Sequence, residues 1–204
     1  MKLIKRGAEA EIYLSEWRDR KIILKKRVPK TYRKEEIDKR LREARTKLEA
    51  KLISEARSFG VPTPIIYDVD TKESQIMMEY VDGERIKEAL HNADKEKQQI
   101  LCIGIGNCVG RFHKNDLIHG DLTTSNMILR DEKIHFIDFS LGGKSKEIEA
   151  KGVDLHLLME AFESTHSEIL DMFDHVLEGY KNEYYKANEV IKKVKEIEKR
   201  GRYT

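Results

Sequence analysis

Two short motifs joined by a hairpin constrain the fold of this chain more than any other feature. The first, LIHGDLTTSNMIL, contains Asp121 and Asn126, and the second, HFIDFS, contains Asp138. Between them, residues 127–130 and 134–137 have the composition of two strands joined by a polar turn. Because Asn126 directly precedes the first strand and Asp138 directly follows the second, an antiparallel hairpin would bring these two side chains together.

This set of side chains is suited to phosphoryl transfer from ATP. That reaction needs a carboxylate to orient the attacking hydroxyl, and oxygen ligands that hold Mg²⁺ against the phosphates. Asp121 fits the first role, and Asn126 and Asp138 fit the second. The alternative is a purely structural capped turn in which these side chains satisfy backbone donors. The coincidence of two correctly spaced motifs favours the catalytic interpretation.

The remaining pattern predicts an α+β fold in two parts. Alternating apolar and polar positions indicate antiparallel strands in the first thirty residues and at 65–69 and 75–81. Apolar residues at steps of three and four predict one long helix over 35–59. After Gly83 the pattern is mainly helical, with predicted helices at 86–90, 95–114, 153–162, 167–185 and 188–199. We therefore expect an N-terminal lobe over 1–81, a C-terminal lobe over 82–197 and a basic tail over 198–204.

Composition narrows the class of protein. A chain of 204 residues suits a minimal two-lobed domain. With 39 basic and 37 acidic residues, the overall field gives no reason to expect nucleic acid, so any RNA contact requires a local patch. Cys102 and Cys108 lack metal-ligand spacing and are expected to be buried and reduced. No apolar run has the length of a membrane span, and we expect a cytoplasmic protein without membrane association.

The motif HGDLTTSN followed by IDFS resembles the protein-kinase catalytic loop HRDLxxxxN followed by DFG. The resemblance implies a minimal two-lobed kinase-like fold in which Asp121 is the catalytic base and Asn126 and Asp138 bind magnesium. Gly120 replaces the arginine that reads a phosphorylated activation loop in many kinases, and no APE motif follows. Activation-loop control and a peptide-binding platform are therefore not expected. Asp154 resembles the buried aspartate that braces the catalytic loop, the alternative being an acid near a helix N-terminus.

A kinase-like site also requires a lysine on an early strand and a helical glutamate that holds it. Lys25, in IILKKR, occupies the position of the lysine in VAIK, and Glu49 lies on the long predicted helix. Lys25 is preferred over Lys26 because apolar residues precede it, and strand alternation sends the two to opposite faces. The alternatives are a solvated strand lysine and a surface pair between Glu49 and Arg45.

The expected nucleotide site departs from the usual kinase pattern. Only Gly7 remains of a GxGxxG motif, and Ile12 takes the usual valine position. The segment MMEYVDG resembles the strand that leads to the hinge, where backbone groups near Glu79 and Val81 would bind adenine. An ordinary buried strand ending in a turn is the alternative. Leu129, in the strand after the catalytic loop, is also expected to contact the nucleotide.

Five segments together are distinctive: GAEAEIY, LKKRVPKTYR, HGDLTTSNMIL, IDFS without APE, and KRGRYT. The combination resembles the small atypical kinase subunit of the KEOPS complex, which helps to make threonylcarbamoyladenosine on tRNA. It implies an archaeal origin, serine/threonine autokinase and ATPase activity with ATP and Mg²⁺, and tRNA contact through the complex. The implied partners are the threonylcarbamoyl-transferring subunit and a further small subunit. Lys199, Arg200 and Arg202 would form a mobile basic tail that engages tRNA or a partner.

Two other functions fit parts of the sequence. Aminoglycoside and choline kinases, which phosphorylate small molecules, also carry HGD, a downstream asparagine and IDF, but they typically need extra helical insertions. A pseudokinase scaffold would need none of the retained residues, which are Lys25, Glu49, Asp121, Asn126 and Asp138. The phosphoacceptor stays open, since water would make the protein an ATPase and a serine or threonine hydroxyl would make it a protein kinase.

Overall fold

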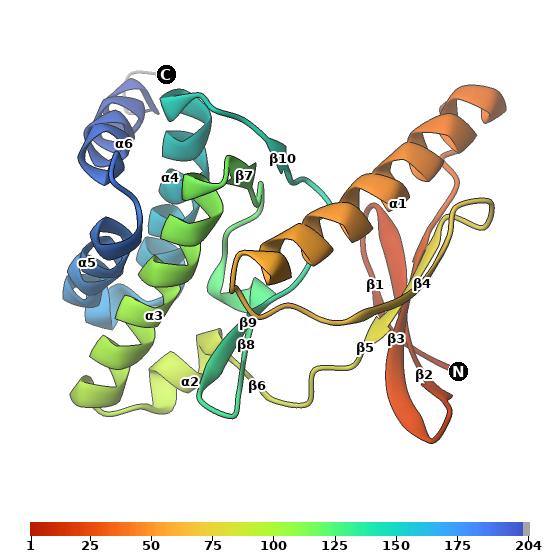
Figure 1. Cartoon of the computed structure of the whole chain (residues 1–204), viewed down its shortest axis with the longest axis horizontal. Coiled ribbons are helices and arrows are strands. Elements are labelled where there is room, and N and C mark those ends of the chain that lie inside the picture. The colour runs from red at the N-terminus through yellow and green to blue at the C-terminus, as the bar shows by residue number, and fades with distance from the viewer. Residues whose placement is uncertain (202–204) are drawn as a thin grey trace.

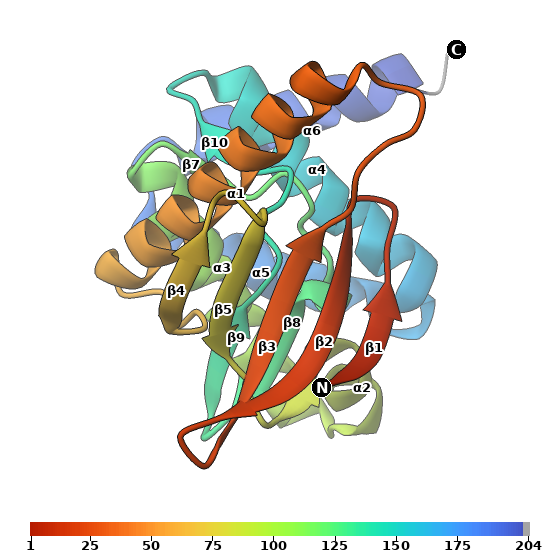
Figure 2. The ribbon, with the colours of Figure 1, turned by 90° about the vertical axis from the view of Figure 1, so that its right-hand side faces the viewer.

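The computed structural model describes residues 1–201 and divides them into a sheet-rich and a helical part (Figure 1). The N-terminal lobe consists of one five-stranded antiparallel sheet and one long helix, in the sheet order β1-β2-β3-β5-β4 (Figure 2). Its elements are β1 (Lys2–Arg6), β2 (Ala10–Trp17), β3 (Arg20–Arg27), α1 (Glu35–Ser58), β4 (Ile66–Asp70) and β5 (Gln75–Glu79).

The turn between β2 and β3 sets the register of the sheet. Arg18 and Asp19 both have positive φ angles, 50° and 60°. Two such residues form the tight hairpin turn whose twist matches that of the flanking strands. The resulting register places Ile12 directly opposite Lys25. Two residues with a sequence-predicted role thus lie on neighbouring strands.

Helix α1 connects the two lobes. It begins with acidic residues in its first turn, which interact favourably with the positive helix end. Its Ala50 packs with Ile76 and Met78 of the sheet in a small core cluster. Only two residues further along, Leu52 belongs to the large core of the C-terminal lobe. Glu49 lies next to this transition, so its carboxylate is held where the lobes meet.

The C-terminal lobe is mainly helical, with two small sheets of orders β6-β8-β9 and β10-β7 (Figure 1). A single large apolar cluster fills it. Its elements are β6 (Glu84–Arg85), α2 (Ile86–Asn92), α3 (Lys95–Lys114), β7 (Leu117–Ile118), the short 3-10 helix η1 (Thr124–Asn126), β8 (Met127–Arg130), β9 (Lys133–Phe136), β10 (Gly143–Lys144), α4 (Ile148–Thr165), the 3-10 helix η2 (Ser167–Met172), α5 (Phe173–Glu183) and α6 (Ala187–Gly201). The predicted α+β architecture, with a sheet and one long helix followed by a helical part, is confirmed.

Three predicted segments need correction. The helix predicted at 153–162 is α4, which begins earlier at Ile148, so only residues 139–147 separate it from Asp138. The helix predicted at 167–185 is broken, because Ile169 leaves the helical region (φ −131°, ψ 36°) where its side chain packs on the core. Residues 198–201, expected in a mobile tail, continue α6, and Arg202 lies outside the described residues.

Two further expectations concern the core and membranes. Cys102 and Cys108 are buried and free, and burial raises the pKa of each thiol to about 12. Within residues 1–201, no helix combines the length and the apolar character that crossing a membrane would require.

Candidate active site

A cavity of about 380 Å³ lies between the lobes. Ile12, Ile23 and Met78 line it from the sheet, and Ile128 and Ile137 line it from the C-terminal lobe. Its walls are therefore apolar on both sides. Such a slot suits a flat, largely apolar ring system.

A second cavity of about 200 Å³ adjoins the first beneath the turn between β1 and β2. Lys5, Ile12, Lys25 and Asp138 line both cavities. Gly7 lines the smaller one, where its N–H donates to the Ala10 carbonyl at 2.9 Å. The charged side chains thus gather at one end of the apolar slot.

Lys25 makes the central contact of the site. Its Nζ lies 2.6 Å from Glu49 Oε1, 2.7 Å from Asp138 Oδ1 and 2.7 Å from Ser140 Oγ. Lys26 instead points to the other face and pairs with the exposed Glu73. The two lysines therefore lie on opposite faces of the strand, and Lys25 is the one that enters the cleft. Glu49 pairs with Lys25 and not with Arg45, whose Nη1 contacts Glu9.

The charges of this cluster reinforce one another. Burial lowers the pKa of Lys25, but the carboxylates of Glu49 and Asp138 outweigh it and leave that pKa raised. Burial likewise raises the pKa of Asp138, but the Lys25 charge and hydrogen bonds from Lys25 and Ser140 hold it well below its usual value. Lys25 and Asp138 are therefore both charged near neutral pH.

Asp121 and Asn126 form the second half of the site. Asn126 Nδ2 donates to Asp121 Oδ2 at 2.8 Å and to the Asp121 carbonyl at 3.0 Å. Because the amide nitrogen is engaged in this way, the amide oxygen of Asn126 remains available as an acceptor. The N–H of Ile137 donates to the Asn126 carbonyl at 3.0 Å, which ties the loop of residues 121–126 to the segment that leads to Asp138. Asn126 and Asp138 line the same cavity, as the hairpin argument predicts.

The backbone conformation just before Asp121 explains why residue 120 is a glycine. Gly120 has a φ of +80°, and an added Cβ would lie 2.2 Å from the Leu141 carbonyl oxygen. Only glycine adopts this conformation without strain or a clash. The buried Asp154 carboxylate accepts the N–H groups of His119 at 2.8 Å and Gly120 at 2.7 Å. Asp154 lies inside α4 and braces the loop that leads to Asp121, so the alternative of an acid that only sits near a helix terminus is wrong.

Asp138 itself has an unusual backbone conformation. Its φ is 65°, in the left-handed region that residues other than glycine seldom occupy. Such conformations cost free energy and persist where the surrounding contacts hold them in place, often at functional sites. Here the side chain is held by Lys25 and by Ser140 Oγ, which lies 2.7 Å from Asp138 Oδ1.

The expected hinge residues lie beside the larger cavity. Glu79 and Val81 both line it. The Glu79 side chain accepts from Arg130 Nη1 at 2.7 Å and from the Ile65 N–H at 3.1 Å. The Arg130 contact crosses from β8 to β5, so this carboxylate holds the lobes together rather than pointing to a ligand.

Leu129 is not among the residues that line the cavity. It packs against the large core, whereas its neighbour Ile128 lines the cavity. Successive residues of β8 face opposite sides, so only one of the two can contact a ligand. The spacing from Asn126 did not by itself show which of them faces inward.

The predicted basic tail is not part of either cavity. Lys199 and Arg200 lie on α6, and Arg200 Nη1 contacts Glu149 of α4 at 2.9 Å. Arg202 lies outside the described residues.

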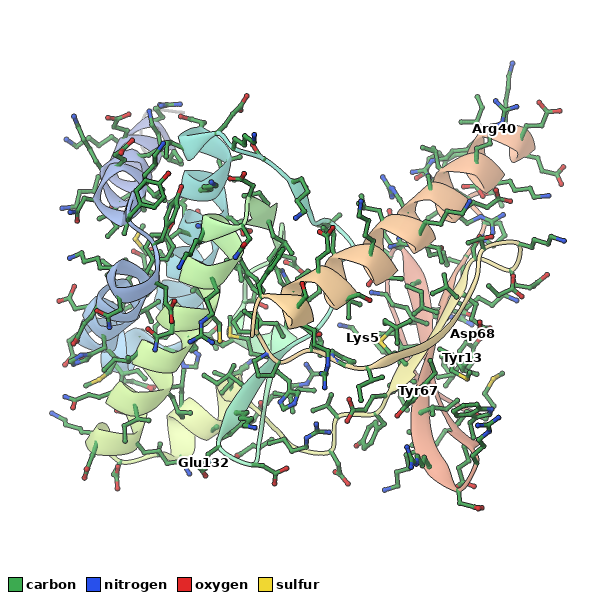
Figure 3. All side chains as sticks on the ribbon, in the orientation of Figure 1. Lys5, Tyr13, Arg40, Tyr67, Asp68 and Glu132 are labelled. Carbon is green, nitrogen blue, oxygen red and sulfur yellow. The ribbon has the colours of Figure 1, made fainter. Side chains whose placement is uncertain are left out.

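Several cavity or cluster residues were not assigned from the sequence, among them Ser140, Lys5 and Arg27. Ser140 lines the smaller cavity and contacts both Lys25 and Asp138. Lys5, labelled in Figure 3, reaches both cavities from the first strand. Arg27 binds Glu49, with Nη2 at 2.6 Å from Oε2. The sequence could have predicted this position of Arg27, because residues two apart in a strand point to the same face and Arg27 follows Lys25 by two.

Comparisons with known proteins show the family of the chain. Residues 9–172 match the RIO domain family (RIO1). The KEOPS complex subunit Bud32 of Pyrococcus abyssi is 48% identical, with 100% of this chain and 96% of that protein covered. A probable bifunctional tRNA threonylcarbamoyladenosine biosynthesis protein of Methanosarcina acetivorans is 45% identical over 97% of this chain, which spans only 35% of that protein.

A solved structure supports the fold assignment. It is the Rio2 kinase-ADP/Mg²⁺-phosphoaspartate complex from Chaetomium thermophilum, similar with a TM-score of 0.65 at 15% identity. The alignment covers 100% of this chain and 72% of that chain, and at this identity it bears on the fold alone. With its kinase-like fold, the family match over residues 9–172 and its full-length similarity to a Bud32 subunit, the chain belongs to the RIO domain family of atypical kinases, in the group of the KEOPS kinase subunits.

Proposed function

We propose that this protein is an ATP-dependent phosphoryl-transfer enzyme, a serine/threonine autokinase and ATPase. We further propose that it acts as the kinase subunit of a KEOPS complex in threonylcarbamoyladenosine modification of tRNA. The observation that carries the proposal is Lys25, which contacts Glu49 at 2.6 Å and Asp138 at 2.7 Å beside a cavity that Asn126 also lines. A cationic lysine held in this way is what phosphate binding in kinase-like sites needs.

Each side chain has a defined task in this proposal. Lys25 binds the α- and β-phosphates of ATP, and Glu49 keeps its side chain in position. Asp121 orients the attacking hydroxyl or water, and the hydrogen bond from Asn126 Nδ2 fixes the rotamer of Asp121. Backbone groups near Glu79 and Val81 bind adenine in the apolar slot, and Gly7 and Ile12 cover the nucleotide from above.

The residues present also fit Mg²⁺. Asp138 offers a carboxylate and Asn126 an amide oxygen on the wall of one cavity. Residues 1–201 contain no cluster of three or more His, Cys, Asp or Glu side chains that could hold a metal. Mg²⁺ needs no such cage, because it is usually held by one or two carboxylates together with substrate phosphates and water. When bound, the ion offsets the charge of the phosphates.

The biological context of the proposal comes from the relatives. The Pyrococcus protein is named as a KEOPS complex subunit, and the Methanosarcina protein as a tRNA threonylcarbamoyladenosine biosynthesis protein. We infer that the partners are the threonylcarbamoyl-transferring subunit and a further small subunit, with tRNA bound through the complex in the cytoplasm. We also propose that tRNA or a partner contacts the basic residues near the C-terminus, Lys199, Arg200 and Arg202. The proposed lobe boundaries are 1–81 for the N-terminal lobe and 82–197 for the C-terminal lobe.

The test is magnesium-dependent phosphate release from ATP, for the protein alone and with the threonylcarbamoyl-transferring subunit and tRNA. Asp138→Asn removes one carboxylate at a residue with a φ of 65°. Asp131→Asn is a matched control, since it makes the same change at an exposed residue with a φ of 50°. Asparagine tolerates positive φ, so both variants should fold.

We expect Asp138→Asn to lower phosphate release at least about 100-fold, a loss of the size found when an electrostatic contact to the transition state is removed. Asp131→Asn should match the wild type, and the partners should accelerate the wild type. Equal rates for Asp138→Asn and the wild type would refute the catalytic assignment. No hydrolysis by the wild type under any condition would instead favour a scaffold.

A further inference from the structure

Arg27 lies on the same face of β3 as the cleft lysine. Lys25 and Arg27 are two positions apart, so their side chains point to the same side of the strand, while Lys26 points to the other. The side chain of Arg27 is only 2% exposed. A buried guanidinium is costly unless its charge is balanced, so its partner reveals its role.

That partner is the carboxylate that also holds Lys25. Glu49 Oε1 lies 2.6 Å from Lys25 Nζ, and Glu49 Oε2 lies 2.6 Å from Arg27 Nη2. One buried carboxylate therefore binds two cations, with one oxygen for each. The usual kinase-like arrangement requires only the lysine.

The other donors of Arg27 argue against a purely structural role. Among the described residues, its buried Nε and Nη1 have no hydrogen-bond partner. A nearby carboxylate oxygen, Glu9 Oε2, lies 3.9 Å from Nη1 and is bound by Arg45 at 2.6 Å. Unsatisfied buried donors cost stability, and an arginine kept only for packing would be expected to have them paired.

The charges of the cluster suggest what Arg27 does. Lys25 and Arg27 together balance Glu49 and Asp138, since Lys25 contacts both carboxylates and Arg27 contacts Glu49. Without Arg27, the contact cluster would hold the two carboxylates of Glu49 and Asp138 against the single ammonium of Lys25. An excess negative charge there would repel a polyphosphate, because the interaction is poorly screened at a buried site.

We propose that Arg27 is a positioning residue that offsets the charge of Glu49, so that the ammonium of Lys25 stays available to the phosphates of ATP. This inference rests on the proposed function, since it assumes that ATP is the ligand. It predicts that Arg27 controls affinity for the nucleotide through charge, and not the rate of the chemical step.

The test is equilibrium binding of a fluorescent ATP analogue, without and with Mg²⁺, together with KM and kcat for ATP hydrolysis. The variants are Arg27→Gln, which removes the charge, and Arg27→Lys, which keeps it. Arg20→Gln is the control, because it makes the same change at an exposed residue of the same strand. Circular dichroism checks the folding of each variant.

We expect Arg27→Gln to weaken binding of the analogue about tenfold and to raise KM by a similar factor, with kcat within about twofold of the wild type. Arg27→Lys should restore binding to within about threefold, and Arg20→Gln should bind like the wild type. A purely structural role would lower the folded fraction without changing the dissociation constant. Unchanged binding by folded Arg27→Gln would overturn the proposal.

Two further outcomes are separable. If Arg27→Gln does not fold, the proposal is tested by the affinity of Arg27→Lys for the ATP analogue. Tenfold weaker binding by Arg27→Lys would show that the positive charge is not what Arg27 supplies. If the wild type does not bind the ATP analogue, the proposed function fails, and the role of Arg27 fails with it.

Discussion

At the scale of single residues, the charge state of Asp138 has a measurable consequence. Its pKa is lowered from an ordinary value of 3.8 because the nearby Lys25 charge and hydrogen bonds outweigh the effect of burial. The group is thus protonated more easily in the unfolded chain. Its stabilising contribution is complete above the unfolded pKa and is lost as the pH falls towards the lowered folded pKa.

This predicts a pH-dependent effect of Asp138→Asn on stability. The variant should have a lower free energy of unfolding than the wild type near pH 6, and the difference should shrink as the pH falls from about 5 to about 2. Urea unfolding at stepped pH values measures it. Asp131→Asn should track the wild type throughout, since Asp131 is 91% exposed and its ion-pair contact, with Arg130, is long at 3.9 Å. A difference for Asp138→Asn that does not change with pH would contradict this account.

At the scale of elements, helices α3 and α5 approach closely through glycines. An added Cβ at Gly106 would lie 2.0 Å from the Val176 carbonyl oxygen, and one at Gly179 would lie 2.1 Å from the Ile103 carbonyl oxygen. These contacts involve backbone, which cannot move aside as a side chain can. The close approach positions α3, whose His113 is hydrogen-bonded both to Tyr180 of α5 and to the loop brace Asp154.

The expected effect of alanine is therefore opposite to its usual effect in helices. In a helix interior, glycine to alanine normally stabilises by about 1 kcal/mol. At Gly106 we expect a loss of about 1–3 kcal/mol from overpacking. Gly104→Ala is the control on the same helix, because its nearest neighbour, at 3.1 Å, is the flexible end of the Ile134 side chain. Thermal unfolding of both variants measures the two changes in stability. If Gly106→Ala is as stable as the wild type, the packing argument is wrong.

At the scale of the whole molecule, the two lobes are joined by a few polar contacts across the cleft. Lys25 meets Asp138 at 2.7 Å, Arg130 meets Glu79 at 2.7 Å, and Lys144 meets Glu55 at 2.8 Å. The interlobe cavity lies beside the first two of these contacts. A ligand that occupies it touches both lobes and should stabilise them together.

We therefore expect ATP with Mg²⁺ to stabilise the folded protein as a unit. At a concentration 100-fold above its dissociation constant, a ligand adds about 2.7 kcal/mol. For a chain of this size, that raises Tm by roughly 5–10 °C. Scanning calorimetry should show a single transition that shifts with nucleotide, and a smaller shift for Asp138→Asn. A shift confined to part of a split transition would show that the lobes unfold independently.

Features that depend on short-range pattern could be predicted from the sequence alone. Strand alternation allowed only one of Lys25 and Lys26 to enter the cleft, the apolar residues before Lys25 selected it, and helical periodicity placed Glu49 on α1. The hairpin argument brought Asn126 and Asp138 to one cavity. Side-chain direction repeats every two residues in a strand and every 3.6 residues in a helix. These features therefore follow from the identities of nearby residues and do not depend on the rest of the chain.

Features that depend on contacts between distant segments became visible only in the folded chain. Ile128 rather than Leu129 lines the cavity, because packing of the hairpin against α2 and the core sets which face is covered. Ser140 and Arg27 gained partners on other elements. Such contacts join residues far apart in the chain, and no local period encodes which oxygen of Glu49 meets which cation.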